Sequence, residues 1–336
     1  MDGNIDLLNS ILTFTLSAAL ALSSALVYRF NPKKSENGLY QDRDGSATEE
    51  SRTTYSIRWQ NVALTSISIS GFAISLATAL VQTSVRHLEA WLLAGAWALL
   101  TLQRAQAFRT RQPVTFFRLT GIEALTFLII AASYTLVLYS FFGLSSRYAS
   151  ITTKALSCTN LVLSVAGFST AISVPRRPRI FHKGRPIDGQ WTVSLFSRYT
   201  YSWPSTFLEQ TRSGKKLTFG DFPVLDHCSR ATDLYDYFNT IAARGGGMLK
   251  QLLLVFLPAL TEQYIFTVID SLFMVAPQFA MYQLLRLLEA RDAGADITAQ
   301  ASFWVIGLGV FIIAAAFFNN WMWWISCATL GIPLRE

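Results

Sequence analysis

The sequence predicts an all-α, polytopic membrane protein with about seven transmembrane helices. Hydrophobic residues make up 51% of the 336 residues and charged residues only 15%, whereas about 25% charged is typical of soluble domains. The mean hydropathy is +0.34. Several uncharged stretches also reach the ~20 residues that a helix needs to cross the hydrocarbon core of a bilayer. Together these observations place most of the chain in a membrane.

The first five spans are expected within residues 1–174. Residues 7–28 carry no charge. Because no basic residue precedes them and no clear cleavage site follows, we interpret them as a retained helix rather than a signal peptide. A mixed-charge loop is expected up to residue 58. The next spans are expected at residues 60–85, 90–103, 124–144 and 155–174, the third being so short that its ends must snorkel.

A polar segment, residues 175–247, separates these spans from two more. Within it, residues 233–243 carry apolar side chains at helical spacing, which predicts a short amphipathic helix lying on the membrane. These side chains are Leu234, Tyr237, Phe238 and Ile241.

The two remaining spans are expected after residue 247. Residues 249–288 are apolar but longer than a bilayer requires, and they are interrupted by Pro258, Glu262, Asp270 and Pro277. We therefore expect an entry segment followed by one long helix. The last span is expected to begin near Ile297, because residues 297–334 carry no charge. That stretch exceeds what a bilayer requires, so its helix is expected to project into the cytoplasm or to end in a turn near Gly331.

The distribution of basic residues predicts the topology. Residues 29–58 hold six Lys or Arg, residues 104–118 four and residues 175–250 twelve, whereas the intervening loops hold few. By the positive-inside rule the N-terminus is outside or lumenal and residues 175–250 are cytoplasmic. The net charge of +7 is explained by this bias, and no nucleic-acid partner is expected.

Metal sites and disulfides are not expected. The cysteines Cys158, Cys228 and Cys327 are scattered, so we interpret them as free thiols. His227 and Cys228 are adjacent, but no second pair of ligands lies at the spacing of a zinc site.

Three motifs follow the fifth span. Residues 197–203 are Ser-Arg-Tyr-Thr-Tyr-Ser-Trp, and a turn containing Lys215 and Lys216 leads to Asp-Phe-Pro-Val-Leu at residues 221–225. Asp270 lies seven residues before Pro277-Gln278, and residues 330–335 are Leu-Gly-Ile-Pro-Leu-Arg. In this order, the elements resemble the N-terminal part of an ABC transporter of the C, or multidrug-resistance-associated, subfamily, particularly its fungal members.

The resemblance implies three domains. Residues 1–174 would be the accessory five-helix domain, residues 175–247 a cytoplasmic linker with an elbow helix, and residues 248–336 the first two helices of a type-1 exporter domain. The full-length relative would use ATP and Mg to export amphipathic or anionic organic compounds from a vacuolar or plasma membrane. The bilayer and the rest of the transporter core would be its partners.

The chain itself is not expected to be an enzyme or to hold a cofactor. No G-x-x-x-x-G-K-[ST] phosphate loop occurs in it, so it resembles a transporter truncated before the nucleotide-binding domains. A noncatalytic membrane scaffold or regulatory protein is an alternative. A seven-helix receptor is a further one, disfavoured by the long linker after the fifth span.

Candidate site residues follow from the resemblance and from charge, with no catalytic residue among them. Asp270 is the sharpest, because an acid in a membrane helix costs about 2.5 to 3.5 kcal/mol on insertion scales and usually faces a partner or a wet cavity. Structural pairing with a basic residue on another helix, or a place near the interface, is the alternative for Asp270. The tryptophans could stack on a substrate or anchor a helix at the headgroups, and the arginines could contact anionic lipid or act as a topology signal alone. The substrate-pathway candidates are Asp270, Gln278, Trp321 and Trp324, and the linker or lipid-contact candidates are Trp203, Arg176, Arg177, Arg179, Lys215 and Lys216.

Overall fold

The computed structural model is mostly helical and divides into two compact units. It describes residues 2–30, 40–42, 44–81, 87–110, 112–142, 151–182, 184–214, 218, 222–226, 230–243, 245, 247–292 and 298–327. Unit 1 comprises Met1–Tyr40, Ala47–Arg179 and Thr192–Arg198, and unit 2 comprises Gln41–Ser46, Ile180–Trp191 and Tyr199–Glu336.

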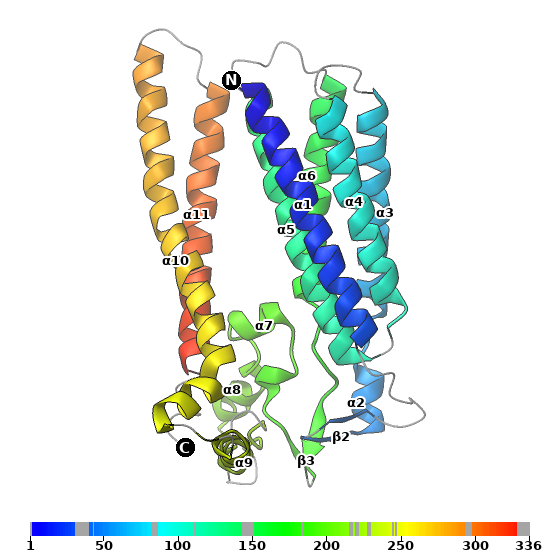
Figure 1. Ribbon diagram of the computed structural model, residues 1–336, viewed down its shortest axis with the longest axis vertical. Helices are drawn as coiled ribbons and strands as arrows, with labels where there is room; N and C mark the ends of the chain where they lie inside the picture. The colour runs from blue at the N-terminus through cyan, green and yellow to red at the C-terminus, as the bar shows by residue number, and fades with distance from the viewer. Residues whose placement is uncertain are drawn as a thin grey trace. The chain divides into compact units, whose positions relative to one another are not determined.

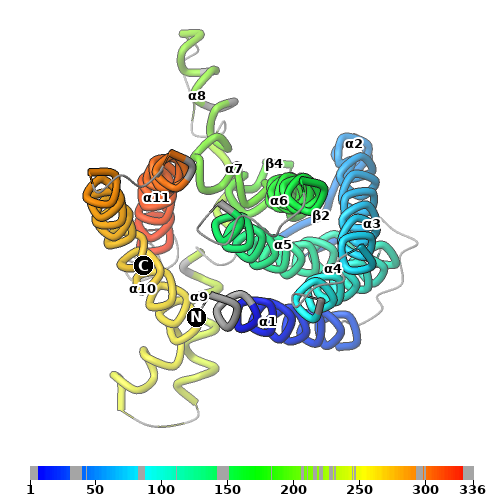
Figure 2. The backbone as a smooth tube through the Cα atoms, turned by 90° about the horizontal axis from the view of Figure 1, so that it is seen from above, coloured from blue at the N-terminus to red at the C-terminus, as the bar shows by residue number. Residues whose placement is uncertain are grey.

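Unit 1 is a bundle of five long helices, seen end-on in Figure 2. Helix α4 packs against α1, α3 and α5, and α6 packs against α3 and α5. A short helix, α2, precedes α3, and the Thr48 side chain caps it by accepting a hydrogen bond from the Ser51 N–H. The helices are α1 (Asp2–Phe30), α2 (Glu49–Thr54), α3 (Arg58–Val81), α4 (His87–Phe108), α5 (Pro113–Phe142) and α6 (Ile151–Ile172).

The centre of unit 1 is built from two aromatic rings between two glycines. Trp97 of α4 and Phe127 of α5 are fully buried, and their rings meet edge to face with centroids 6.0 Å apart. A Cβ at Gly71 of α3 would lie 2.2 Å from the Trp97 ring, and one at Gly167 of α6 would lie 2.3 Å from the Phe127 ring. The glycines therefore let α3 and α6 approach the rings, as small residues do in membrane bundles.

Gly71→Ala is expected to destabilise the bundle by about 1 to 3 kcal/mol, because the added methyl group must displace a buried ring. Thermal unfolding of the purified chain in detergent measures the effect. Gly121→Ala is the matched control, since a Cβ at Gly121 of α5 meets nothing within 4 Å. Equal losses of melting temperature in the two variants would contradict the proposed role of Gly71.

Six helices in the described part of the chain are long and apolar enough to cross a membrane, as expected for an integral membrane protein. The sequence predicted about seven, and the difference is the helix expected at residues 90–103. This helix is α4, which has 22 residues and so is long enough, but polar residues near both of its ends lower its hydropathy. The six spans are Leu7–Phe30, Glu49–Val81, Pro113–Phe141, Ile151–Ile172, Met248–Asp292 and Gln300–Ile325.

The predicted boundaries of the third and fourth spans are wrong. Helix α4 continues to Phe108, and α5 begins at Pro113 rather than at residue 124. Arg104 and Arg118, which we expected in a basic loop, therefore lie within helices. The reason is that Arg104 has an acidic partner inside the bundle, as described below.

A small sheet departs from the all-α prediction. Its strands are β1 (Gln41–Asp42), β2 (Gly45–Ala47), β3 (Ile180–His182) and β4 (Arg185–Pro186), in the order β1-β2-β3-β4. A Cβ at Gly45 would lie 2.3 Å from the Phe181 carbonyl oxygen, so glycine permits the close approach of these segments. Asp44 is fully buried and accepts a hydrogen bond from Arg230 at 3.1 Å. Residues 41–46 of the first predicted loop thus pack with the predicted linker in unit 2.

The other helices are α7 (Leu195–Tyr199), α8 (Ser205–Arg212), α9 (Ala231–Ala242), α10 (Met248–Asp292) and α11 (Thr298–Ile325), with a 3-10 turn at Gly189–Trp191. In unit 2, α10 packs against α9 and α11, and the α10–α11 pair is antiparallel (Figure 1). The amphipathic helix predicted at residues 233–243 is present as α9. Its Ile241 is buried and its Leu234 and Phe238 are partly buried, whereas Tyr237 is exposed.

Helix α10 is continuous from Met248 to Asp292, so the predicted break into an entry segment and a separate helix is wrong. Pro258 removes one N–H and displaces the carbonyl group four residues earlier, which bends a helix without ending it when the flanking residues are helical. Figures 1 and 2 show the first part of α10 bent relative to the rest. The turn predicted near Gly331 and the motif at residues 330–335 lie outside the described residues.

Candidate functional site

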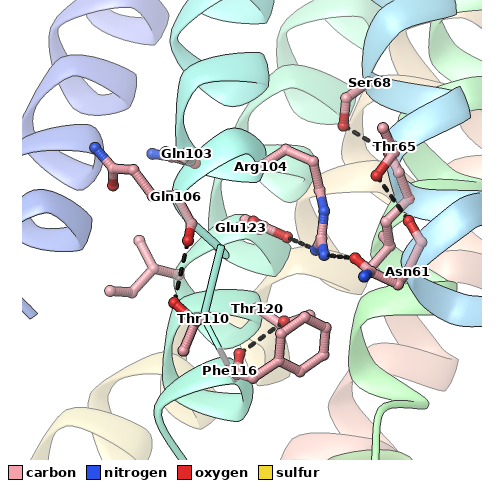
Figure 3. A network of polar contacts seen from close by, with 12 residues as sticks. Asn61, Thr65, Ser68, Gln103, Arg104, Gln106, Thr110, Phe116, Thr120 and Glu123 are labelled. Carbon is pink, nitrogen blue, oxygen red and sulfur yellow. Dashed lines mark hydrogen bonds and ion pairs between the residues drawn. The ribbon is translucent and has the colours of Figure 1, made fainter. Parts of the chain in front are cut away.

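A buried ion pair joins three helices of unit 1. Arg104 of α4 and Glu123 of α5 are 2% and 1% exposed, and the Arg104 Nη1 lies 2.8 Å from the Glu123 Oε2. The Arg104 Nη2 donates to the Asn61 Oδ1 of α3, so the guanidinium bridges both partners (Figure 3). The Arg104 Cζ also lies 5.2 Å from the centre of the Phe116 ring. This arrangement neutralises Arg104 where water does not reach it.

Neighbouring polar side chains extend this cluster, and Figure 3 shows two of them, Gln103 and Gln106, on the same helix as Arg104. The Thr126 hydroxyl donates to the Gln103 Oε1 at 3.1 Å, and the Ser24 hydroxyl donates to the Gln106 Oε1 at 3.1 Å. Because α1, α3, α4 and α5 all contribute, the cluster fixes their register. Sequence analysis missed it: Arg104 was assigned to a loop and Glu123 was not singled out. The sequence did contain a signal for the pair: Arg104 and Glu123 adjoin neighbouring apolar stretches and carry opposite charges.

A second cluster of polar side chains lies in unit 1, farther along the bundle from the Arg104–Glu123 ion pair. The Tyr134 hydroxyl of α5 lies 3.1 Å from the Ser75 hydroxyl of α3 and accepts a hydrogen bond from the Asn160 Nδ2 of α6 at 3.0 Å. A cavity of ≈ 20 Å³ lies beside it, lined also by Glu89 and Ser157. This space suffices for about one water molecule.

In unit 2, the linker packs against the end of α11 through aromatic rings. Tyr199 lies 3.9 Å from Trp321 and 5.7 Å from Trp324, measured between ring centroids. Trp191 lies 5.4 Å from Trp324, which is 5% exposed. On the other side, Trp321 lies 4.1 Å from Phe266 of α10. The two tryptophans proposed for a substrate pathway are thus packed among rings from the linker and α10.

Tyr201 adds a polar contact to the same end of α11. Its hydroxyl donates to the Asn320 carbonyl oxygen at 3.4 Å, and its backbone is left-handed with φ 54°. Partial burial, followed by the Cys327 sulfur, raises the pKa of Tyr201 above its ordinary value.

Tyr199→Ala is expected to loosen the linker from α11, because it removes ring contacts with Trp321 and Trp324. Hydrogen–deuterium exchange of the full chain should show faster exchange at residues 195–203, by about tenfold for a loss of ~1.4 kcal/mol. The control is Tyr235→Ala, since Tyr235 of α9 is 66% exposed. Unchanged exchange at residues 195–203 in Tyr199→Ala would show that the rings do not hold the linker.

Asp270 and Gln278 of α10 are not brought together. Asp270 is 9% exposed, whereas Gln278 is exposed. One carboxylate oxygen of Asp270 has no hydrogen-bond partner among the described residues. The expectation that Asp270 faces a partner or a pathway stays a prediction.

The basic residues after α6 differ in exposure. Arg177 is buried, Arg176 is partly buried and Arg179 is exposed. The N–H groups of Arg176 and Arg177 donate to the Thr192 carbonyl oxygen at 3.1 and 3.3 Å, which folds this segment back on itself. Of the three, Arg179 is the most open to lipid or solvent.

The remaining linker candidates are only partly described. Trp203 is partly buried, with its ring 3.8 Å from the position of a Cβ at Gly189. Lys215 and Lys216 lie outside the described residues, as do His227 and Cys228. Among the residues that are described, no cluster of His, Cys, Asp or Glu could hold a metal ion. Cys158 and Cys327 are free thiols, as predicted for them.

Comparison with protein-family models and with curated proteins finds no match for this chain.

Proposed function

We propose that this chain forms the membrane portion of an ATP-driven ABC-type exporter of organic compounds. The packing of Tyr199 against Trp321 at 3.9 Å carries the proposal. Tyr199 belongs to the linker motif at residues 197–203, and Trp321 belongs to the helix pair that the resemblance assigns to the exporter core. A linker that joins an accessory domain to such a core is expected to dock on it in this way.

Two further features support the proposal. The amphipathic helix α9 directly precedes α10 and packs against it, as an elbow helix does at a membrane surface. An ionisable residue, Asp270, is buried where α10 passes through the predicted membrane region, and such residues commonly mark a transport pathway.

Sequencing of the transcript beyond the codon for Glu336 tests the proposal. We expect further apolar spans followed by a G-x-x-x-x-G-K-[ST] phosphate loop. The protein that includes them should then take up organic solutes into inverted vesicles when ATP and Mg are supplied. A stop codon directly after Glu336 would contradict the proposal and favour a noncatalytic membrane scaffold.

We further propose a topology with the N-terminus outside or lumenal and residues 175–250 cytoplasmic, in a vacuolar or plasma membrane. The excess of Lys and Arg in residues 175–250 supports it. Single cysteines at Ser213 and Ala293, introduced after Cys158, Cys228 and Cys327 are replaced by serine, test this arrangement. An impermeant thiol reagent should reach residue 293 from outside, and residue 213 only after the membrane is permeabilised; the reverse pattern would overturn the topology.

A further inference from the structure

Asp270 occupies the seam between α10 and α11. Gln263 of α10 donates to the Ser326 hydroxyl of α11 at 2.8 Å, and the Thr267 hydroxyl lies 3.6 Å from the Met322 sulfur. Asp270 follows these residues at the i+7 and i+3 positions, so it lies on the same face of α10. It is 9% exposed, and its Oδ1 has no hydrogen-bond partner among the described residues. A buried carboxylate of this kind is unfavourable unless a positive group or donor compensates it.

Aromatic rings lie on both sides of this carboxylate along the seam. Phe266 lies one turn before Asp270, and its ring centroid is 4.1 Å from that of Trp321. Phe273 lies one turn after Asp270, and its ring centroid is 4.7 Å from that of Phe318. Trp321 and Phe318 are stacked nearly parallel, with centroids 6.0 Å apart and an interplanar angle of 7°. An ammonium group is attracted both to a carboxylate and to the face of an aromatic ring, because both are negative. Phe266 and Phe273 flank Asp270 on α10.

The charges on the two helices favour a cation over an anion. Between Lys250 and Arg286, α10 carries only Glu262 and Asp270, and α11 carries no charged residue. An anionic group at the seam would therefore meet the Asp270 carboxylate with no basic side chain of either helix to offset the repulsion.

We propose that Asp270, flanked by Phe266 and Phe273, forms a binding site for the ammonium group of an amphipathic organic cation. This proposal rests on the proposed function, because it names the class of compound that the exporter carries. That class is cationic, whereas the resemblance implied amphipathic or anionic compounds.

Binding of decyltrimethylammonium to the full chain in lipid nanodiscs tests the proposal, with tryptophan fluorescence as the readout and empty nanodiscs as the correction for partitioning. The wild type should bind this cation saturably and should not bind decyl sulfate, which has the same chain length. Asp270→Asn should weaken binding about tenfold, the size of a desolvated cation–carboxylate or cation–π interaction. Glu262→Gln, which removes an exposed acid from the same helix, should leave binding unchanged.

A second measurement uses the wild type alone, so it holds even if Asp270→Asn does not fold. A hydrophobic carbodiimide should modify Asp270, as detected by peptide mass spectrometry, and decyltrimethylammonium should slow the modification. Absence of saturable binding, equal binding by Asp270→Asn, preference for decyl sulfate or lack of protection would each overturn the proposal. If a phosphate loop follows Glu336 but the cation does not bind, the exporter function stands and only the cation site falls.

Discussion

Arg104→Met is expected to destabilise unit 1 by about 3 to 5 kcal/mol, because it leaves the Glu123 carboxylate buried and uncompensated. The pair is 2.8 Å apart and almost wholly shielded from solvent. Loss of Arg104 also removes the hydrogen bond to Asn61 of α3, so three helices lose a common contact. Denaturation of the purified chain in detergent, followed by tryptophan fluorescence, measures the effect.

Two comparisons identify the cause of that loss. Arg118→Met removes an exposed arginine of α5 and should stay within about 0.5 kcal/mol of the wild type. In the double variant Arg104→Met/Glu123→Leu, stability should return towards the wild type, since replacement of both charges by apolar residues is often neutral or stabilising. A double variant as unstable as the sum of the two single variants would show that the residues act independently.

Sequence patterns predicted the elements whose signal is local. The apolar stretches that became α1, α3 and α6 lie within a few residues of the expected ranges, because their hydropathy is high throughout, and α11 begins next to the expected start at Ile297. Helix α9 was predicted from the spacing of its apolar residues, which holds except at Tyr237.

The errors arose where a polar residue inside a helix was interpreted as the end of that helix. Arg104 was taken as the limit of the third span, and the fourth was placed only after Glu123, yet each residue is compatible with a buried helix because the other neutralises it. A hydropathy scale gives each residue its own value, so it does not register that a charged residue of α4 is neutralised by a charged residue of α5. Pro258 misled in a similar way, since the helix continues through it.

The sheet and the linker contacts could not be predicted, because they depend on pairing between distant segments. The strands at residues 41–47 and 180–186 have two or three residues each, too few for a periodic signal. For the candidate site, Asp270 and the tryptophans were singled out by residue type. Their neighbours Tyr199, Phe273 and Phe318 became apparent only when the linker, α10 and α11 were seen packed together.

Trp97→Ala is expected to lower the stability of unit 1 by about 3 kcal/mol or more, as large-to-small changes at buried aromatic residues do. Trp97 is fully buried, fills the space against Gly71 of α3 and packs edge to face on Phe127 of α5. Lipid tails are as apolar as the bundle interior, so transfer from water does not hold these helices together once they span the membrane. The loss therefore comes from packing: the ring contacts disappear, and the glycine on α3 has no side chain with which to fill the cavity.

Trp91→Ala is the matched control, because Trp91 lies on the same helix but is 40% exposed. Its removal should cost clearly less in the same unfolding measurement. The double variant Trp97→Ala/Gly71→Leu should recover part of the loss, since a leucine side chain from α3 can enter the vacated space. If Gly71→Leu gave no recovery in the Trp97→Ala background, the glycine would not serve to accommodate the ring. Recovery would establish that α3 and α4 are held at their close separation by the complementary volumes of Gly71 and Trp97.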